Sequence, residues 1–136
     1  MGWMMDQYSI IQRKISPGVV TGKPLAMGGS EGRDAATGTG AFYVINAILP
    51  KFDQFPQKTS VAVQGFGKVG APLAELLAKA GYKVVAVSDS QGGIYAPQGL
   101  DIPSIRQYKN QNRAIKGVYC QGSVCNLVEH HTISNE

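Results

Sequence analysis

The chain has 136 residues, of which 43% are hydrophobic and 16% charged, and its formal net charge is +4 at pH 7. This composition predicts a modest globular protein and excludes a disordered polypeptide. No segment approaches the roughly 18 consecutive apolar residues of a membrane span, and the N-terminus lacks the charged-then-apolar layout of a secretory signal. We therefore expect a soluble cytoplasmic protein that does not bind a membrane.

The first 50 residues predict two helices joined by a glycine-rich loop. The first helix covers about residues 1–15, and residues 17–32 form the loop, which is long enough to suggest that it binds something. The second helix runs from about Arg33 to Leu49, and Pro50 ends it. Its first half consists of small residues, which indicates close approach by another backbone or by a ligand. Tight helix-to-sheet packing explains this composition equally well.

The segment from residue 61 to residue 89 carries the most informative pattern. A short apolar run leads into Gly65-Phe66-Gly67-Lys68-Val69-Gly70, apolar residues then recur with helical spacing, and a second apolar run ends at Asp89. Strand, glycine turn, helix, strand and acid follow each other as in a dinucleotide-binding βαβ unit. Asp89 lies 19 residues after Gly70, close to the spacing of about 20 expected for an acid that binds the ribose.

The residue types in this turn suit a pyrophosphate group. Gly65 permits a tight turn, Gly67 leaves the backbone open to the phosphates, and Gly70 lets the helix pack closely on the strand. The helix N-terminus would add free N–H groups and the positive end of its dipole. The alternative is an ordinary glycine-rich turn with Asp89 capping a loop, but both strands, the helix and the acid in order favour a cofactor site.

The elements after residue 90 are predicted to be shorter. Residues 93–95 form a possible extended piece, and Asp101 is expected to cap a helix that has Pro103 in its first turn. Residues 118–120 are a candidate third strand. The expected fold class is therefore α/β, a partial Rossmann-type domain preceded by two helices and a glycine-rich loop.

Four basic residues recur with helical spacing near the end of the chain: Arg106, Lys109, Arg113 and Lys116. Such a stripe could follow a nucleic-acid backbone. No stacking aromatics or groove-reading motif accompany it, so a solvated helix face is the better interpretation and we expect no nucleic-acid partner.

Two cysteines and two histidines invite a zinc hypothesis. Cys120 and Cys125 are followed by the adjacent His130 and His131. Adjacent histidines do not easily ligate one ion, and the spacing departs from that of structural zinc sites. We therefore expect no metal site and reduced thiols.

Three separated segments together resemble a known family. They are similar to glutamate dehydrogenase of the Glu/Leu/Phe/Val dehydrogenase superfamily. The segments are PGVVTGKPLAMGGSEGRDAATGTGA at 17–41, VAVQGFGKVG at 61–70 and AGYKVVAVSDSQGGIYAPQGLDI at 80–102. The similarity covers residues 2–136. It implies oxidative deamination of L-glutamate to 2-oxoglutarate and ammonia, with hydride transfer to NAD or NADP.

The resemblance also assigns roles to residues near the turn. Thr37 would contact the nicotinamide carboxamide, with Arg33 near the active cleft, and Gly65, Gly67 and Gly70 would hold the pyrophosphate. Lys68 stands where the family commonly has asparagine, and it could instead offer its charge to the phosphates.

The remaining predicted cofactor-binding residues lie beside these. Phe66 and Val69 belong to the same turn, and Ser88 and Ser90 flank Asp89. Asp89 would repel a 2′-phosphate and no arginine follows it at 90–92, so the cofactor is predicted to be NAD, with NADP as the possible alternative.

The family's catalytic lysine and aspartate lie in a domain that precedes the segment similar to residues 1–9. We therefore expect a fragment: a hinge-side helix and loop at 1–32 and a partial NAD(P)-binding domain at 33–136, with no catalytic residue and no turnover by itself. Glutamate would bind only with the missing domain, and a homo- or hetero-oligomer is possible. A non-catalytic NAD(P)-binding module or an inactive relic is the alternative.

Overall fold

The computed structural model describes residues 1–115, 119–121 and 124–126, so Lys116, His130 and His131 lie outside the described residues. The chain divides into two compact units, Met1–Ala36 and Thr37–Glu136. The division falls inside helix α2 (Arg33–Ile48), a few residues after the expected boundary before Arg33.

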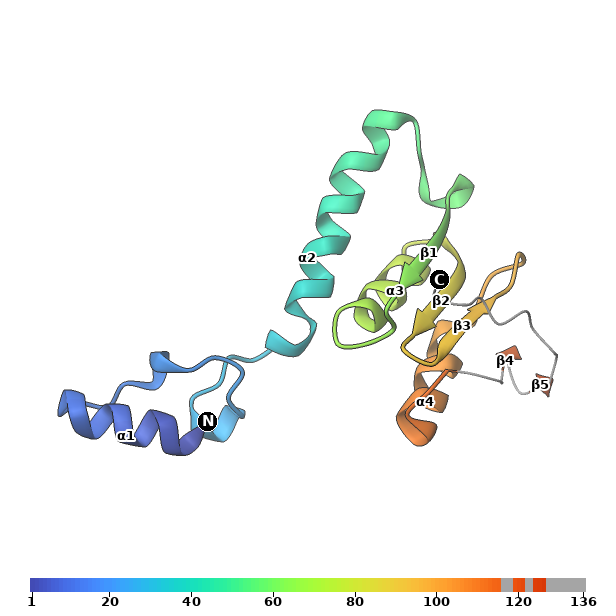
Figure 1. The fold of residues 1–136 in the computed structure, drawn as a ribbon. Helices are drawn as coiled ribbons and strands as arrows, with labels where there is room; N and C mark the ends of the chain where they lie inside the picture. The colour runs from blue at the N-terminus through green and yellow to red at the C-terminus, as the bar shows by residue number, and fades with distance from the viewer. Residues whose placement is uncertain (116–118, 122–123, 127–136) are drawn as a thin grey trace. The chain divides into compact units, whose positions relative to one another are not determined.

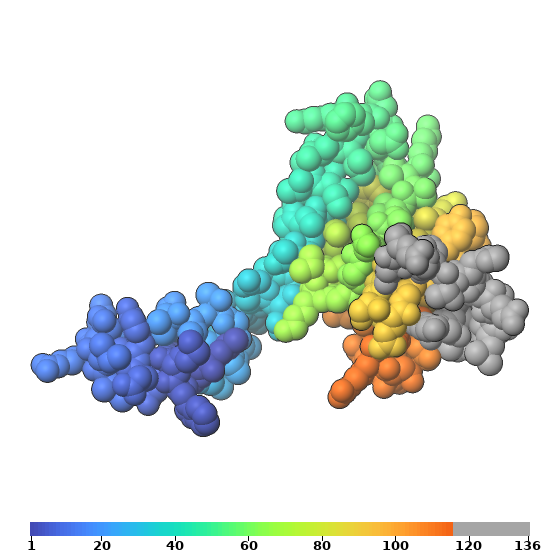
Figure 2. Space-filling model, viewed as in Figure 1, coloured from blue at the N-terminus to red at the C-terminus, as the bar shows by residue number. Residues whose placement is uncertain are grey.

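The first unit contains helix α1 (Gly2–Gln12) and two short 3-10 helices, η1 (Pro17–Val19) and η2 (Leu25–Met27). None of its residues is buried, and the side chain of Trp3 on α1 is 92% exposed. Figure 2 shows this unit in blue. The loop is closed by polar contacts: Lys23 Nζ donates to the carbonyls of Pro17 and Val20 at 2.6 Å each.

The second unit is built on the predicted strand–helix–strand sequence. Strand β1 (Ser60–Gln64) is followed by helix α3 (Gly70–Lys79) and strand β2 (Lys83–Asp89), and β1 and β2 pair in parallel (Figure 1). Strand β3 (Gly92–Tyr95) pairs antiparallel to β2, so the sheet order is β1-β2-β3. The expected extended piece at 93–95 is therefore β3, and the partial Rossmann-type α/β fold is confirmed.

The core of this unit lies where α3 and helix α4 (Ile102–Asn112) pack with the strands. Each of these helices turns an apolar face inward, as the helical spacing predicted. Part of α2 covers the core as well, through Phe42 and Ile45, and so does Leu49, which directly follows the helix. The buried apolar side chains include Val63, Phe66, Ala74, Leu77, Val84, Val87, Ile94, Ile102, Ile105 and Ile115.

The connecting segments follow local sequence signals. Two 3-10 helices, η3 (Leu49–Phe52) and η4 (Pro56–Lys58), link α2 to β1. Asp101 caps α4 by accepting from the Ser104 N–H at 3.4 Å, with Pro103 in the first turn, as predicted.

A short antiparallel pair follows α4. Strand β4 (Tyr119–Gln121) pairs with β5 (Val124–Asn126), and the register sets Cys120 opposite Cys125. The expected strand at 118–120 is thus found one residue later, and residue 118 lies outside the described residues. No helix in the described part of the chain is long and apolar enough to cross a membrane.

The basic stripe on α4 is not simply a solvated face. Arg106 pairs with Glu75 of α3, and Lys109 pairs with Asp89 at the end of β2. The interpretation as a solvated face was therefore wrong for Lys109, whose side chain is 23% exposed, whereas the side chain of Arg106 is still 41% exposed. Periodicity shows which residues share a helix face but not what that face meets.

We expect Leu77→Ala to lower the free energy of unfolding by about 2–5 kcal/mol, because it leaves a cavity in a fully buried core position. Urea denaturation followed by circular dichroism measures this change. Lys79→Ala, at an exposed position of the same helix, should change stability by no more than about 0.5 kcal/mol. Equal losses for the two variants would contradict this description of the core.

Candidate functional site

The turn between β1 and α3 is closed by an unusually tight backbone contact. Gly65 has φ +90°, a conformation that L side chains rarely adopt. A Cβ built on Gly70 would lie 2.0 Å from the Gly65 carbonyl oxygen, so no larger residue fits there. The N–H groups of Gly65 and Phe66 both donate to the Ser88 carbonyl, at 3.0 and 2.6 Å, and fix the turn to the end of β2.

The start of α3 offers hydrogen-bond donors. The N–H groups of Lys68, Val69 and Gly70 have no acceptor among the described residues, and no side chain caps the helix. A Cβ built on Gly67 would meet nothing within 4 Å, so the backbone there is open to an approaching group. Unpaired N–H groups and the positive end of the helix dipole together favour an anion such as a phosphate. Lys68 is exposed beside them and adds a cation.

Phe66 differs from its neighbours in the turn. Its side chain is 1% exposed and belongs to the core, where Lys109 Nζ lies 5.9 Å from the ring centroid. Its N–H already bonds to Ser88. Of the predicted cofactor-binding residues, Phe66 therefore has the least to offer a ligand and the clearest role in packing.

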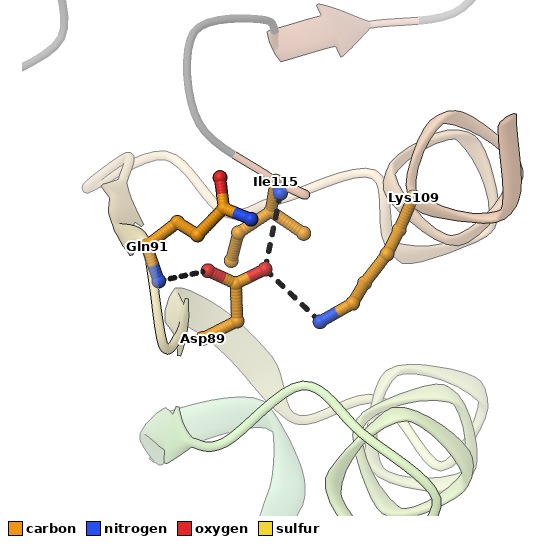
Figure 3. Close-up of polar contacts among 4 residues, drawn as sticks. All are labelled: Asp89, Gln91, Lys109 and Ile115. Atoms are coloured by element: carbon orange, nitrogen blue, oxygen red, sulfur yellow. Dashed lines mark hydrogen bonds and ion pairs between the residues drawn. The ribbon is translucent and has the colours of Figure 1, made fainter. Parts of the chain in front are cut away.

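Asp89, at the C-terminal end of β2, accepts hydrogen bonds from at least three donors (Figure 3). One carboxylate oxygen accepts from the Gln91 N–H at 2.9 Å, and the other accepts from Lys109 Nζ at 3.0 Å and the Ile115 N–H at 3.2 Å. The side chain is 7% exposed. Burial raises the pKa of Asp89, but the hydrogen bonds from Gln91, Lys109 and Ile115 and the charge of Lys109 outweigh burial and hold the pKa below its usual value.

The structure brings the glycine turn and the acid to the same edge of the sheet. Ser88, which accepts the two N–H groups of the turn, directly precedes Asp89, and its own side chain is half-buried. Ser90 follows on the exposed surface. The partners of Asp89 had not been expected, since Lys109 belonged to the basic stripe and nothing in the sequence marked Ile115.

Arg33 and Thr37 both lie on α2 and are both exposed. Arg33 belongs to the first unit and Thr37 to the second. Next to Thr37, Gly38 is buried against the start of α3: a Cβ there would lie 2.6 Å from the Val69 carbonyl oxygen. At Gly38 the small residues thus serve packing against another backbone, one of the two explanations left open by the sequence.

These features define a partial Rossmann-type domain. They are a parallel β–α–β unit, a tight glycine turn, an uncapped helix start and an acid at the end of the second strand. The family model of the glutamate/leucine/phenylalanine/valine dehydrogenases matches residues 28–136. The chain belongs to this family.

Relatives with curated descriptions are glutamate dehydrogenases of both coenzyme types. The chain is 64% identical to the NADP-specific glutamate dehydrogenase of Synechocystis sp. over 135 residues, which are 99% of this chain and 32% of that protein. It is 47% identical to the catabolic NAD-specific glutamate dehydrogenase RocG of Bacillus subtilis over 103 residues, which are 76% of this chain and 24% of that protein.

Solved structures of the family have the same fold. The hetero-hexameric glutamate dehydrogenase from Thermus thermophilus matches with a TM-score of 0.75 and 43% identity, over 85% of this chain and 28% of that one. The enzyme from Peptoniphilus asaccharolyticus matches with a TM-score of 0.72 and 34% identity, over 84% and 30%. The chain thus spans about a quarter to a third of the length of these relatives.

We expect Asp89→Asn to lower the free energy of unfolding at neutral pH by about 1–3 kcal/mol, because charge-assisted hydrogen bonds are lost. Since folding lowers the pKa of Asp89, its contribution is present above the unfolded pKa of about 3.9 and is lost as pH falls through the folded pKa. In urea denaturation between pH 2 and 7, the free energies of unfolding of the wild type and Asp89→Asn should therefore become equal only under acid conditions. Asp6→Asn, at an exposed position of α1, controls for the lost charge. A stability gap that does not depend on pH would contradict this role.

Proposed function

We propose that this chain binds a nicotinamide adenine dinucleotide and supplies the cofactor part of an enzyme that oxidatively deaminates L-glutamate to 2-oxoglutarate and ammonia. The observation that carries the proposal is the set of N–H groups at Lys68, Val69 and Gly70, which lack an acceptor among the described residues and lie beside the open backbone of Gly67. The glutamate dehydrogenases among its relatives support the reaction.

We propose that residues of the β1–α3 turn, the end of β2 and α2 bind successive parts of the cofactor. In the proposal, the pyrophosphate accepts from the N–H groups at the start of α3, and Lys68 offsets its charge. Asp89 would accept hydrogen bonds from the hydroxyls of the adenosine ribose, beside or in place of its present donors. Thr37 would contact the nicotinamide carboxamide. When bound, the nicotinamide accepts a hydride from the amino acid, while the chain binds and orients it.

Arg33 is proposed to lie near the active cleft, and no residue of this chain is proposed as the catalytic acid or base. The relatives are about three times as long, so we propose that glutamate binding and proton transfer depend on residues outside positions 1–136. Because the Thermus thermophilus relative is described as hetero-hexameric, we also propose that the chain works in an oligomer. Glutamate-dependent reduction of NAD by residues 1–136 alone would overturn the proposal that glutamate binding and proton transfer depend on residues outside these positions.

Gly67→Ala tests the phosphate site directly. The added methyl group meets no protein atom within 4 Å, so the variant should fold, but it would occupy the approach to the N–H groups. We expect at least about a tenfold loss of NAD affinity by calorimetric titration, equivalent to about 1.4 kcal/mol. Gly40→Ala, which also meets nothing within 4 Å but lies away from the turn, should bind as the wild type does. Unchanged NAD binding in a folded Gly67→Ala variant would refute the site.

The preference between NAD and NADP is proposed to depend on Asp89 and Lys109 together. The carboxylate disfavours a 2′-phosphate, so NAD is the favoured cofactor, but its pairing with Lys109 at 3.0 Å reduces that repulsion and admits NADP. We expect Lys109→Met to weaken NADP binding about tenfold more than NAD binding, because Asp89 keeps its charge and loses the offsetting charge of Lys109.

Arg106→Met is the matched control for this prediction. Arg106 lies on the same helix but pairs with Glu75 instead of Asp89, so its loss should affect both cofactors little and alike. Calorimetric titration of each variant with NAD and with NADP gives its ratio of NAD to NADP affinity. Equal weakening of both cofactors by Lys109→Met would show that Lys109 has no part in the preference.

A further inference from the structure

We propose that Gly38 is a positioning residue that sets the spacing between Thr37 and the phosphate-binding turn, and so fixes how the dinucleotide reaches from its pyrophosphate to its nicotinamide. This inference rests on the proposed function. It concerns two stretches of the second unit, α2 from Thr37 onward and the start of α3.

The contact at Gly38 joins backbone to backbone. A Cβ on Gly38 would lie 2.6 Å from the Val69 carbonyl oxygen, 3.1 Å from the Leu73 nitrogen and 3.3 Å from Pro72 Cβ. The Val69 carbonyl is itself the acceptor of the Leu73 N–H, at 3.2 Å, in the first turn of α3. Gly38 is also the buried residue of α2. Helix α2 therefore rests directly on the turn whose N–H groups are proposed to hold the phosphates.

The later part of α2 is fixed by separate contacts. Tyr82 Oη donates to Asn46 Oδ1 at 2.9 Å, and Phe42 and Ile45 pack against the core. A methyl group at position 38 would thus tilt the Thr37 end of the helix away while the other end stays anchored. Bringing a 2.6 Å contact to an ordinary separation needs a shift of about 1 Å. A displacement of that size is large for a group that must meet a bound cofactor.

The same helix offers a matched control. Gly40 lies two residues further on, and a Cβ there meets nothing within 4 Å. Alanine at either position favours the helix by up to about 1 kcal/mol over glycine, so the two substitutions differ in the contact with α3 and not in helix propensity.

The experiment compares two ligands by calorimetric titration of the full chain. NAD carries the nicotinamide, whereas ADP-ribose has the adenosine, both phosphates and the second ribose without it. We expect Gly38→Ala to lower the ratio of NAD to ADP-ribose affinity at least tenfold, and Gly40→Ala to leave the ratio as in the wild type.

A purely structural role for Gly38 predicts a different result. General loosening of the fold would weaken the binding of both ligands alike, so the ratio of NAD to ADP-ribose affinity would stay unchanged. That outcome would overturn the proposal. If the wild-type chain binds neither ligand, the proposed cofactor site itself fails, which is a distinct result.

A second pair of variants applies if Gly38→Ala does not fold. Pro72→Gly removes the Cβ that lies beneath Gly38, whereas Pro72→Ala keeps it and removes only the ring closure. We expect Pro72→Gly to lower the ratio of NAD to ADP-ribose affinity at least threefold relative to Pro72→Ala. Equal ratios in this pair would also overturn the role assigned to the contact.

Discussion

The carbonyl of Gly65 and the Cα of Gly70 approach so closely that a Cβ would be 2.0 Å from the oxygen, and this contact determines most of what surrounds it. It lets α3 begin within a few residues of the end of β1, and the residue at its N-cap is Val69, whose apolar side chain cannot accept a hydrogen bond. The N–H groups of Lys68, Val69 and Gly70, just before and at the start of α3, have no protein acceptor among the described residues.

Asp89 adds a second constraint at the same edge of the sheet. A carboxylate that is 7% exposed is stable only when it is paired, and its partners come from the turn after β2, from α4 and from the segment after α4. The three donors thereby hold these segments together around the end of β2. In the proposed site, the Asp89 carboxylate that meets the ribose thus also links these segments. Substitutions at Asp89 therefore affect both stability and cofactor binding, whereas substitutions at Gly67 should affect cofactor binding alone.

Local features could be predicted from the sequence, and long-range ones could not. The Asp101 cap with Pro103, the glycine turn and both strands depend on neighbouring residues, so their spacing was enough. The pairing of Lys109 with Asp89 joins residues 20 positions apart, and the spacing that linked Lys109 to Arg106 could not show that each meets a different acid. The contact of Gly38 with Val69 joins residues 31 positions apart. Small side chains predicted a close approach there, but only the coordinates identify which backbone approaches.

Glycine in this chain therefore has several separable physical roles, although a sequence motif treats them alike. Gly65 is needed for its positive φ, Gly70 and Gly38 for contacts that a Cβ would block, and Gly67 for neither, because a Cβ there has free space around it. Within this turn, Gly67 is thus the glycine whose missing side chain the protein itself does not explain and an approaching ligand would explain. In a motif of the form G-x-G-x-x-G, the outer glycines thus report on the fold, and the middle glycine carries the information about the cofactor.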